Sequence, residues 1–164
     1  MMRKFLLLLP VLLLSPSIHA AELKVGDPAP SFTAKDETGK TISLSDFKGK
    51  AVLLYFYPMD NTPGCIIEAQ SFRDHYSEFQ NLDTVILGIN FNNQQSHQDF
   101  KTKQQIPYPL LVDADHAIAK AYGVKGDQFP SRDVIQIDDK GKIMKILRGV
   151  NPSTIVAELL KNTY

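Results

Sequence analysis

Cys65 is the only cysteine in this chain of 164 residues, and its setting favours reactivity. It directly follows residues 58–64, PMDNTPG, a turn-forming segment that comes after an apolar run of β-forming residues. The pattern predicts that a helix begins at Cys65, where the unpaired N–H groups of the first turn stabilise a thiolate over a thiol. Because the thiolate is the nucleophilic form of cysteine, the segment predicts a nucleophilic site.

Two neighbours in the same segment could assist such a nucleophile. Thr62 stands three residues before Cys65 and offers a hydroxyl to the sulfur or to an oxygen bound there, and Pro58 could shield the sulfur from water. The competing interpretation is that a lone cysteine serves as a small buried hydrophobe. A polar, proline-containing turn is an unfavourable place for a packing residue, so we favour the functional interpretation.

The elements that must position Cys65 alternate along the chain between strand and helix. Residues 51–57, AVLLYFY, form an apolar run typical of a strand buried on both faces, and residues 84–89 form a second one. Apolar residues spaced by three and four predict a helix from Cys65 to about Phe79. Further expected elements are a hairpin of residues 31–34 and 41–44, helices at 94–105 and 116–122, a strand at 110–112, a hairpin of 133–137 and 142–147, and a helix over 151–160. This order predicts an α/β domain in three layers.

The first twenty residues have the three-part layout of a secretory signal peptide. A short basic start precedes an apolar run from Phe5 to Leu14, which is too short to span a bilayer, and the segment ends at Ala20. We therefore expect a signal peptide at residues 1–20, one domain at residues 21–164, and a periplasmic or secreted protein. An uncleaved membrane anchor is the alternative.

Composition argues against several other classes of protein. The chain has 18 basic and 18 acidic side chains, with no basic stripe of the kind that binds nucleic acid. His75, His97 and His116 lack the spacing of metal ligands, so we expect no metal and no other cofactor. A single cysteine cannot form an internal disulfide, and a lone thiol in an oxidising compartment is either buried or kept for its reactivity.

The pattern Pro58-x-x-x-Thr62-x-x-Cys65 resembles the active site of peroxiredoxins. The longer string at residues 55–65, with EA at 68–69 and FRD at 72–74, is similar to the Q-type, or bacterioferritin-comigratory, group. The resemblance implies a thioredoxin-like fold: a central mixed sheet flanked by helices, with an N-terminal β-hairpin. It also implies reduction of hydroperoxides, in which the thiolate attacks the terminal peroxide oxygen, becomes a sulfenic acid and releases water or an alcohol.

The same resemblance implies an arginine close to the sulfur. Residues 129–134, FPSRDV, are similar to the segment that supplies it, so Arg132 is the candidate. Its guanidinium would stabilise the thiolate and hold the peroxide with fixed donors. Glu68 lies one helical turn after Cys65 and would orient the arginine, unless it is an exposed helix carboxylate.

One position departs from the group. Many members carry a second cysteine five residues after the first, where this chain has Gln70. The chain therefore resembles a one-cysteine variant, whose sulfenic acid must be reduced by an external thiol through a mixed disulfide. The implied partners are a hydroperoxide substrate and a thioredoxin-like protein, a glutaredoxin-like protein or glutathione as reductant. We expect no nucleic-acid or membrane partner, and a monomer or weak dimer.

Two other functions use the same fold. A dithiol oxidoreductase needs a Cys-x-x-Cys pair, and Thr62 occupies the first of those positions, which argues strongly against dithiol exchange. A non-catalytic module that senses oxidant or binds a partner through Cys65 stays open, because a sensor needs the same activated thiol. Turnover with a reductant would separate a peroxidase from a sensor.

Overall fold

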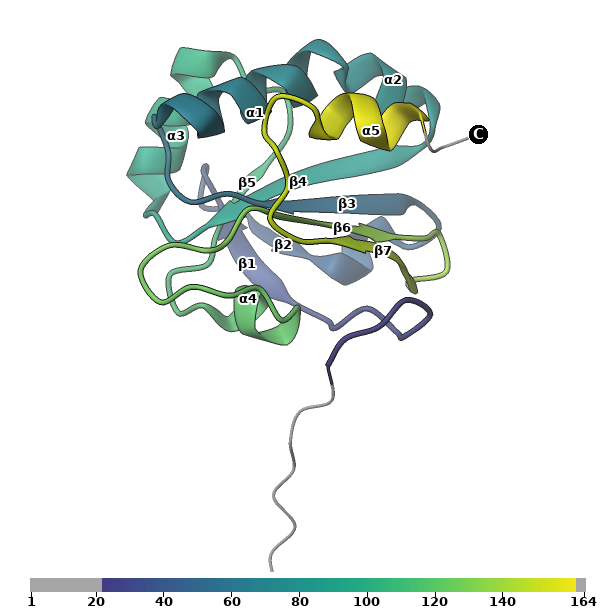
Figure 1. Cartoon of the computed structure of the whole chain (residues 1–164). Helices are drawn as coiled ribbons and strands as arrows, with labels where there is room; N and C mark the ends of the chain where they lie inside the picture. The colour runs from purple at the N-terminus through teal and green to yellow at the C-terminus, as the bar shows by residue number, and fades with distance from the viewer. Residues whose placement is uncertain (1–21, 162–164) are drawn as a thin grey trace, which may run out of the picture.

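Seven strands form one mixed sheet in the order β2-β1-β5-β4-β3-β6-β7. The computed structural model describes residues 22–161 of the chain (Figure 1). The strands are β1 (Thr33–Asp36), β2 (Thr41–Ser43), β3 (Ala51–Phe56), β4 (Thr84–Asn90), β5 (Leu110–Val112), β6 (Asp133–Ile137) and β7 (Ile143–Leu147). The helices are the 3-10 turn η1 (Leu44–Phe47), α1 (Pro63–Asp74), α2 (Tyr76–Asn81), α3 (Gln94–Gln104), α4 (Ala117–Ala121) and α5 (Ile155–Lys161).

Strand β3 lies inside the sheet, parallel to β4 and antiparallel to β6. Its side chains alternate between two cores: Leu53 and Tyr55 pack in one cluster, and Leu54 and Phe56 in the other. All four side chains are fully buried. A strand covered on both faces has no polar side to keep in water, which explains the continuous apolar run.

Helices cover the two faces of the sheet unequally. Figure 1 shows α1, α2, α3 and α5 on one face and α4 on the other. Phe72 of α1, Phe100 of α3 and Ile155 of α5 belong to the first core, and Ile118 of α4 belongs to the second. The three layers are those predicted from the alternation of strands and helices.

The N-terminal hairpin is present at one edge of the sheet. Strands β1 and β2 pair antiparallel, and β1 also pairs antiparallel with β5. Asp36 closes the turn between the two hairpin strands by accepting the backbone N–H groups of Thr38 and Lys40, each at 2.9 Å. The sequence prediction of a hairpin before the first buried strand is confirmed.

Strand pairing also brings distant residues to one edge of the sheet. Phe56 at the end of β3 lies opposite Asp133 at the start of β6. The segment that follows β3 therefore begins next to the residue that precedes β6. These two places hold Cys65 and its candidate arginine.

Two helices differ from the prediction by more than one residue at a boundary. The helix expected from Cys65 to Phe79 begins two residues earlier, at Pro63, and is divided at His75, whose ring nitrogen Nδ1 donates to the carbonyl of Ser71 at 2.9 Å. The final helix begins at Ile155 and not at Asn151. Asn151 instead organises a turn, because its side chain accepts the N–H of Ser153 at 2.9 Å.

The predicted signal peptide lies outside the described residues. Within residues 22–161, no helix combines the length and the apolar character that a membrane crossing requires.

Candidate active site

Cys65 lies in the first turn of α1. Thr62 precedes the helix with extended backbone angles, Pro63 is its first residue, and the N–H of Ile66 donates to the Thr62 carbonyl at 2.9 Å. Proline suits this first position because its missing N–H would have no helical acceptor. The sulfur thus lies near the positive end of a helix of 12 residues, and the Cys65 side chain is only 1% exposed.

Arg132 contacts the sulfur from the other side. It immediately precedes β6, and its Nη2 donates to Cys65 Sγ at 3.4 Å. The N–H of Val150 donates to the Arg132 carbonyl at 2.9 Å, which fixes the backbone that carries the guanidinium. Burial lowers the pKa of Arg132, but Glu68 and Cys65 outweigh this and raise it, so the guanidinium stays charged. The structure therefore brings together two residues separated by 67 positions in the sequence.

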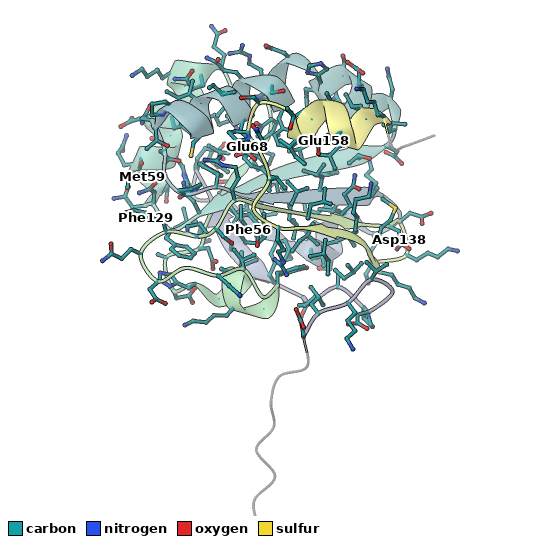
Figure 2. All side chains as sticks on the ribbon, viewed as in Figure 1. Phe56, Met59, Glu68, Phe129, Asp138 and Glu158 are labelled. Carbon is teal, nitrogen blue, oxygen red and sulfur yellow. The ribbon has the colours of Figure 1, made fainter. Side chains whose placement is uncertain are left out.

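Glu68 occupies the same face of α1, one turn after Cys65. Its Oε2 accepts a hydrogen bond from Nη1 of Arg132, and its side chain is fully buried. Figure 2 shows Glu68 between the helical layer and the sheet. Burial raises the pKa of Glu68 to about 7, and Arg132 opposes that rise only in part. The interpretation of Glu68 as an exposed helix carboxylate is wrong, and its contact with the arginine is the one expected.

The second carboxylate oxygen of Glu68 has no partner. Among residues 22–161, Oε1 of Glu68 is the one buried side-chain nitrogen or oxygen without a hydrogen bond. Buried polar atoms are normally paired, because an unmade hydrogen bond costs about 1–3 kcal/mol. This exception lies one helical turn from the candidate nucleophile.

Gly64 and Pro152 shape the site, and sequence reasoning gave neither this role. A Cβ atom at Gly64 would lie 3.3 Å from Nη2 of Arg132 and 3.7 Å from Cγ of Pro152. Gly64 was expected to serve the turn, yet it lies inside α1, and what it provides is space for the guanidinium. Pro152 was predicted to start the last helix, and it instead lies in the turn before α5, against Gly64.

Thr62 and Pro58 stand at the start of the site. The hydroxyl of Thr62 donates to the Met59 carbonyl at 2.9 Å, which closes the turn before α1. Its proton is thus used within the turn, and its oxygen can accept a hydrogen bond from a bound peroxide. Pro58 is half-buried after β3. Its shielding of the sulfur stays a prediction.

A second buried pair of side chains supports the turn that precedes α1. Asp60 and His97 are both buried, with Nδ1 of His97 2.9 Å from Oδ2 of Asp60 and Nε2 of His97 3.1 Å from the Leu111 carbonyl. Both ring nitrogens of His97 thus lie within hydrogen-bond distance of an oxygen atom. The remaining donors to the Asp60 carboxylate are Tyr57 at 2.8 Å, Asn90 at 3.0 Å and Ser96 at 2.7 Å. Burial alone would raise the pKa of Asp60, but His97, Ser96 and Tyr57 lower it.

The sulfur is almost completely enclosed, since Cys65 is only 1% exposed. Hollows of about 480 Å³ beside Lys120 and about 340 Å³ beside Phe47 lie elsewhere, and Cys65 lines neither of them. A nearly buried sulfur suits a substrate that presents a small reacting atom. Within the described part of the chain, no group of three or more His, Cys, Asp or Glu side chains could hold a metal ion.

Comparisons with known sequences agree with this geometry. Residues 25–146 match the AhpC/TSA family. Peroxiredoxin Bcp of Bacillus subtilis is 40% identical over 147 residues, which cover 85% of this chain and 94% of that protein. The chloroplastic peroxiredoxin Q of Populus jackii is 41% identical over 145 residues, covering 86% of this chain and 68% of that protein.

Solved structures show the same fold. Peroxidoxin BcpB of Mycobacterium tuberculosis matches with a TM-score of 0.80 at 29% identity, over 85% of this chain and 96% of that one. A PrxQ mutant of Xylella fastidiosa matches with a TM-score of 0.81 at 26% identity, over 87% and 96% of the two chains. The expected thioredoxin-like fold is confirmed. The chain therefore belongs to the AhpC/TSA family, in the peroxiredoxin Q and Bcp group of thiol peroxidases.

Proposed function

We propose that the protein reduces hydrogen peroxide and organic hydroperoxides at Cys65 and that an external thiol completes each cycle. The observation that carries the proposal is the position of Cys65 Sγ, in the first turn of α1 and 3.4 Å from Nη2 of Arg132. A helix N-terminus and a fixed guanidinium together favour the thiolate and the negative charge of the reaction. A related protein of known structure, the bacterioferritin comigratory protein of Xanthomonas campestris, is 26% identical and has alkyl peroxide reduction activity.

The chemistry needs only the residues around the sulfur. The thiolate attacks the terminal oxygen of the peroxide, the O–O bond breaks, and Cys65 becomes a sulfenic acid while water or an alcohol leaves. Arg132 keeps its donors where negative charge passes from sulfur to the leaving oxygen. Thr62 orients the peroxide by accepting its O–H, since its own proton is held by Met59.

An external reductant follows from the single cysteine. Gln70 stands where a resolving cysteine is common in the group, and its side chain donates to Oε1 of Gln104 in α3 at 2.9 Å. The sulfenic acid is therefore reduced through a mixed disulfide with a thioredoxin-like protein, a glutaredoxin-like protein or glutathione. The predicted signal peptide supports a periplasmic or secreted location, with residues 21–164 as the working domain.

Turnover distinguishes this function from a redox sensor. The purified, reduced protein is mixed with hydrogen peroxide, and peroxide loss is followed with and without added dithiol. We expect rapid loss of about one equivalent without dithiol and continuous loss with it. Cys65→Ser should abolish peroxide loss under both conditions, and retained activity in that variant would contradict the mechanism. A single slow oxidation of Cys65 without turnover would instead support the sensor, which the family relationship disfavours.

A further inference from the structure

One guanidinium serves two acids in this site. Arg132 donates through Nη2 to Cys65 Sγ and through Nη1 to Glu68 Oε2. Cys65 and Glu68 project from the same face of α1, and their side chains are 1% and 0% exposed. Two negative charges would therefore share one positive charge in a space closed to water.

Ionisation of both Cys65 and Glu68 beside the single guanidinium of Arg132 is unfavourable. A buried charge without its own partner costs several kcal/mol, and a like charge nearby disfavours ionisation of each group. The remaining polar groups facing Glu68 supply no compensating charge. Tyr55 from β3 and Tyr108 before β5 are buried phenols whose pKa values are raised chiefly by burial, so both stay neutral. The buried α5 side chains in this core, Ile155, Val156 and Leu159, are apolar, and the charged Glu158 and Lys161 are exposed.

We propose that Cys65 and Glu68 share one proton, so that Glu68 is a carboxylic acid whenever Cys65 is a thiolate. The inference rests on the proposed function of Cys65 as the reacting thiol. Oε1 of Glu68 is the site of the proton, because Oε2 accepts from Arg132 while Oε1 has no donor. Burial also holds the pKa of Glu68 at about 7, which places its proton exchange in the working range of an enzyme.

This arrangement keeps the net charge of the site constant through the reaction. Before attack, the site holds a thiolate, a carboxylic acid and a guanidinium. After attack, Cys65 is a sulfenic acid, the O–O bond is broken, and the leaving oxygen has taken the proton from Glu68. Glu68 is then a carboxylate paired with Arg132, so the guanidinium always faces one negative charge. Reduction by the external thiol returns the starting state.

The pH dependence of the first oxidation of Cys65 tests the proposal. In the wild-type protein we expect the rate to rise with thiolate formation and to fall by about tenfold above pH about 7, as Glu68 loses the shared proton. Glu68→Gln keeps the size of the side chain and an oxygen to accept from Arg132, but it has no ionisable proton. Its rate should stay at the lower value with no alkaline decline.

The matched control is Glu78→Gln, the same change at an exposed position of α2, which should keep the wild-type profile. An alkaline decline that persists in Glu68→Gln would overturn the proposal. A uniform loss of rate at every pH, with the shape of the profile preserved, would show that Glu68 only holds Arg132 in place and would overturn it equally.

Infrared difference spectroscopy reads the proton without relying on activity. Reduced wild-type protein at pH 7 should show a carboxylic acid band that Glu68→Gln lacks. The band should be weaker in Cys65→Ser, where no thiolate competes for Arg132 and Glu68 ionises more readily. A band of equal strength in the wild type and Cys65→Ser, or no band in either, contradicts the shared proton. Because this readout needs no peroxide turnover, failure of the peroxidase function is distinguishable from failure of the inference.

Discussion

Two buried ion pairs lie next to Cys65, and they differ in how completely they are satisfied. In the pair of Asp60 and His97, both carboxylate oxygens and both ring nitrogens have hydrogen-bond partners. In the pair of Glu68 and Arg132, one carboxylate oxygen has none and the guanidinium also contacts the sulfur. The first pair is closed to further chemistry, and the second retains capacity for a proton.

The difference distinguishes a pair that supports the fold from a pair that takes part in the reaction. Asp60 lies in the turn before α1, where its N–H donates to Oδ1 of Asn92 at 3.0 Å. Its carboxylate receives donors from Tyr57, which directly follows β3, and from β4 and α3. A fully satisfied polar network is rigid, so this pair fixes the path of the chain into the nucleophile. The reacting pair can stay incomplete because the turn beside it does not move.

Breaking the satisfied pair should give the largest effect on stability. His97→Ala leaves the buried Asp60 carboxylate without its imidazole partner, and we expect a loss of about 3–5 kcal/mol in the free energy of unfolding. Urea unfolding at pH 7 measures it. Gln98→Ala, at an exposed position of the same helix, is the control and should change stability by under about 0.5 kcal/mol. A small loss in His97→Ala would mean that the pair does not support the turn.

Breaking the reacting pair should act mainly on rate. Arg132→Ala removes the donor beside the sulfur, and we expect the oxidation of Cys65 by peroxide to slow by about 100- to 1,000-fold. Arg132→Lys keeps a charge but not the two-pronged contact, so it should recover only part of the rate. Arg73→Ala removes an arginine of α1 that donates to the Gln104 carbonyl, and it should leave the rate unchanged. Equal losses in Arg132→Ala and Arg73→Ala would exclude a direct role for Arg132.

The pH dependence of stability sharpens the contrast between the pairs. Glu68 has a pKa of about 7 in the folded protein against an ordinary 4.5. The folded state thus binds this proton more tightly, and the unfolding free energy falls as pH rises between those values. The unfolding free energy should fall by about 3 kcal/mol over this range, and Glu68→Gln should remove this pH dependence. Urea unfolding of the wild type and Glu68→Gln at pH 4.5 and 8 checks the sign of this change. If the unfolding free energy changes equally with pH in both proteins, the raised pKa of Glu68 is contradicted.

Asp60 has the opposite sign. Its pKa is lowered in the folded state, so its contribution is complete above its ordinary pKa and is lost only as pH falls through the lower folded value. The two pairs should therefore lose stability in different pH ranges, Glu68 on the neutral side and Asp60 in acid.

Sequence patterns predicted the scaffold better than the reacting pair. The apolar run of β3 and the turn before Cys65 are local features, and local features are readable from spacing. Arg132 was reached only through a resemblance, since no spacing rule links residues 67 positions apart. The partner of Asp60 was missed because His97 is 37 residues away and was considered only as a metal ligand. The unpaired oxygen of Glu68 depends on burial by several elements at once, which a sequence does not display.

Substitution of Gly64 should give the smallest effect. It separates the effect on stability from the effect on reaction rate at a single residue. Alanine is the better helix former by about 1 kcal/mol, so Gly64→Ala should leave stability unchanged or slightly higher. Its Cβ would lie 3.3 Å from Nη2 of Arg132 and would push the guanidinium away from the sulfur. We expect the rate of Cys65 oxidation to fall by about tenfold, because a displaced donor stabilises the reaction less well. Ser71→Ala, later in the same helix, should leave the rate unchanged. A variant that is slower but no less stable would show that Gly64 was selected for the approach of Arg132, whereas an unaltered rate would show that the guanidinium tolerates the added methyl group.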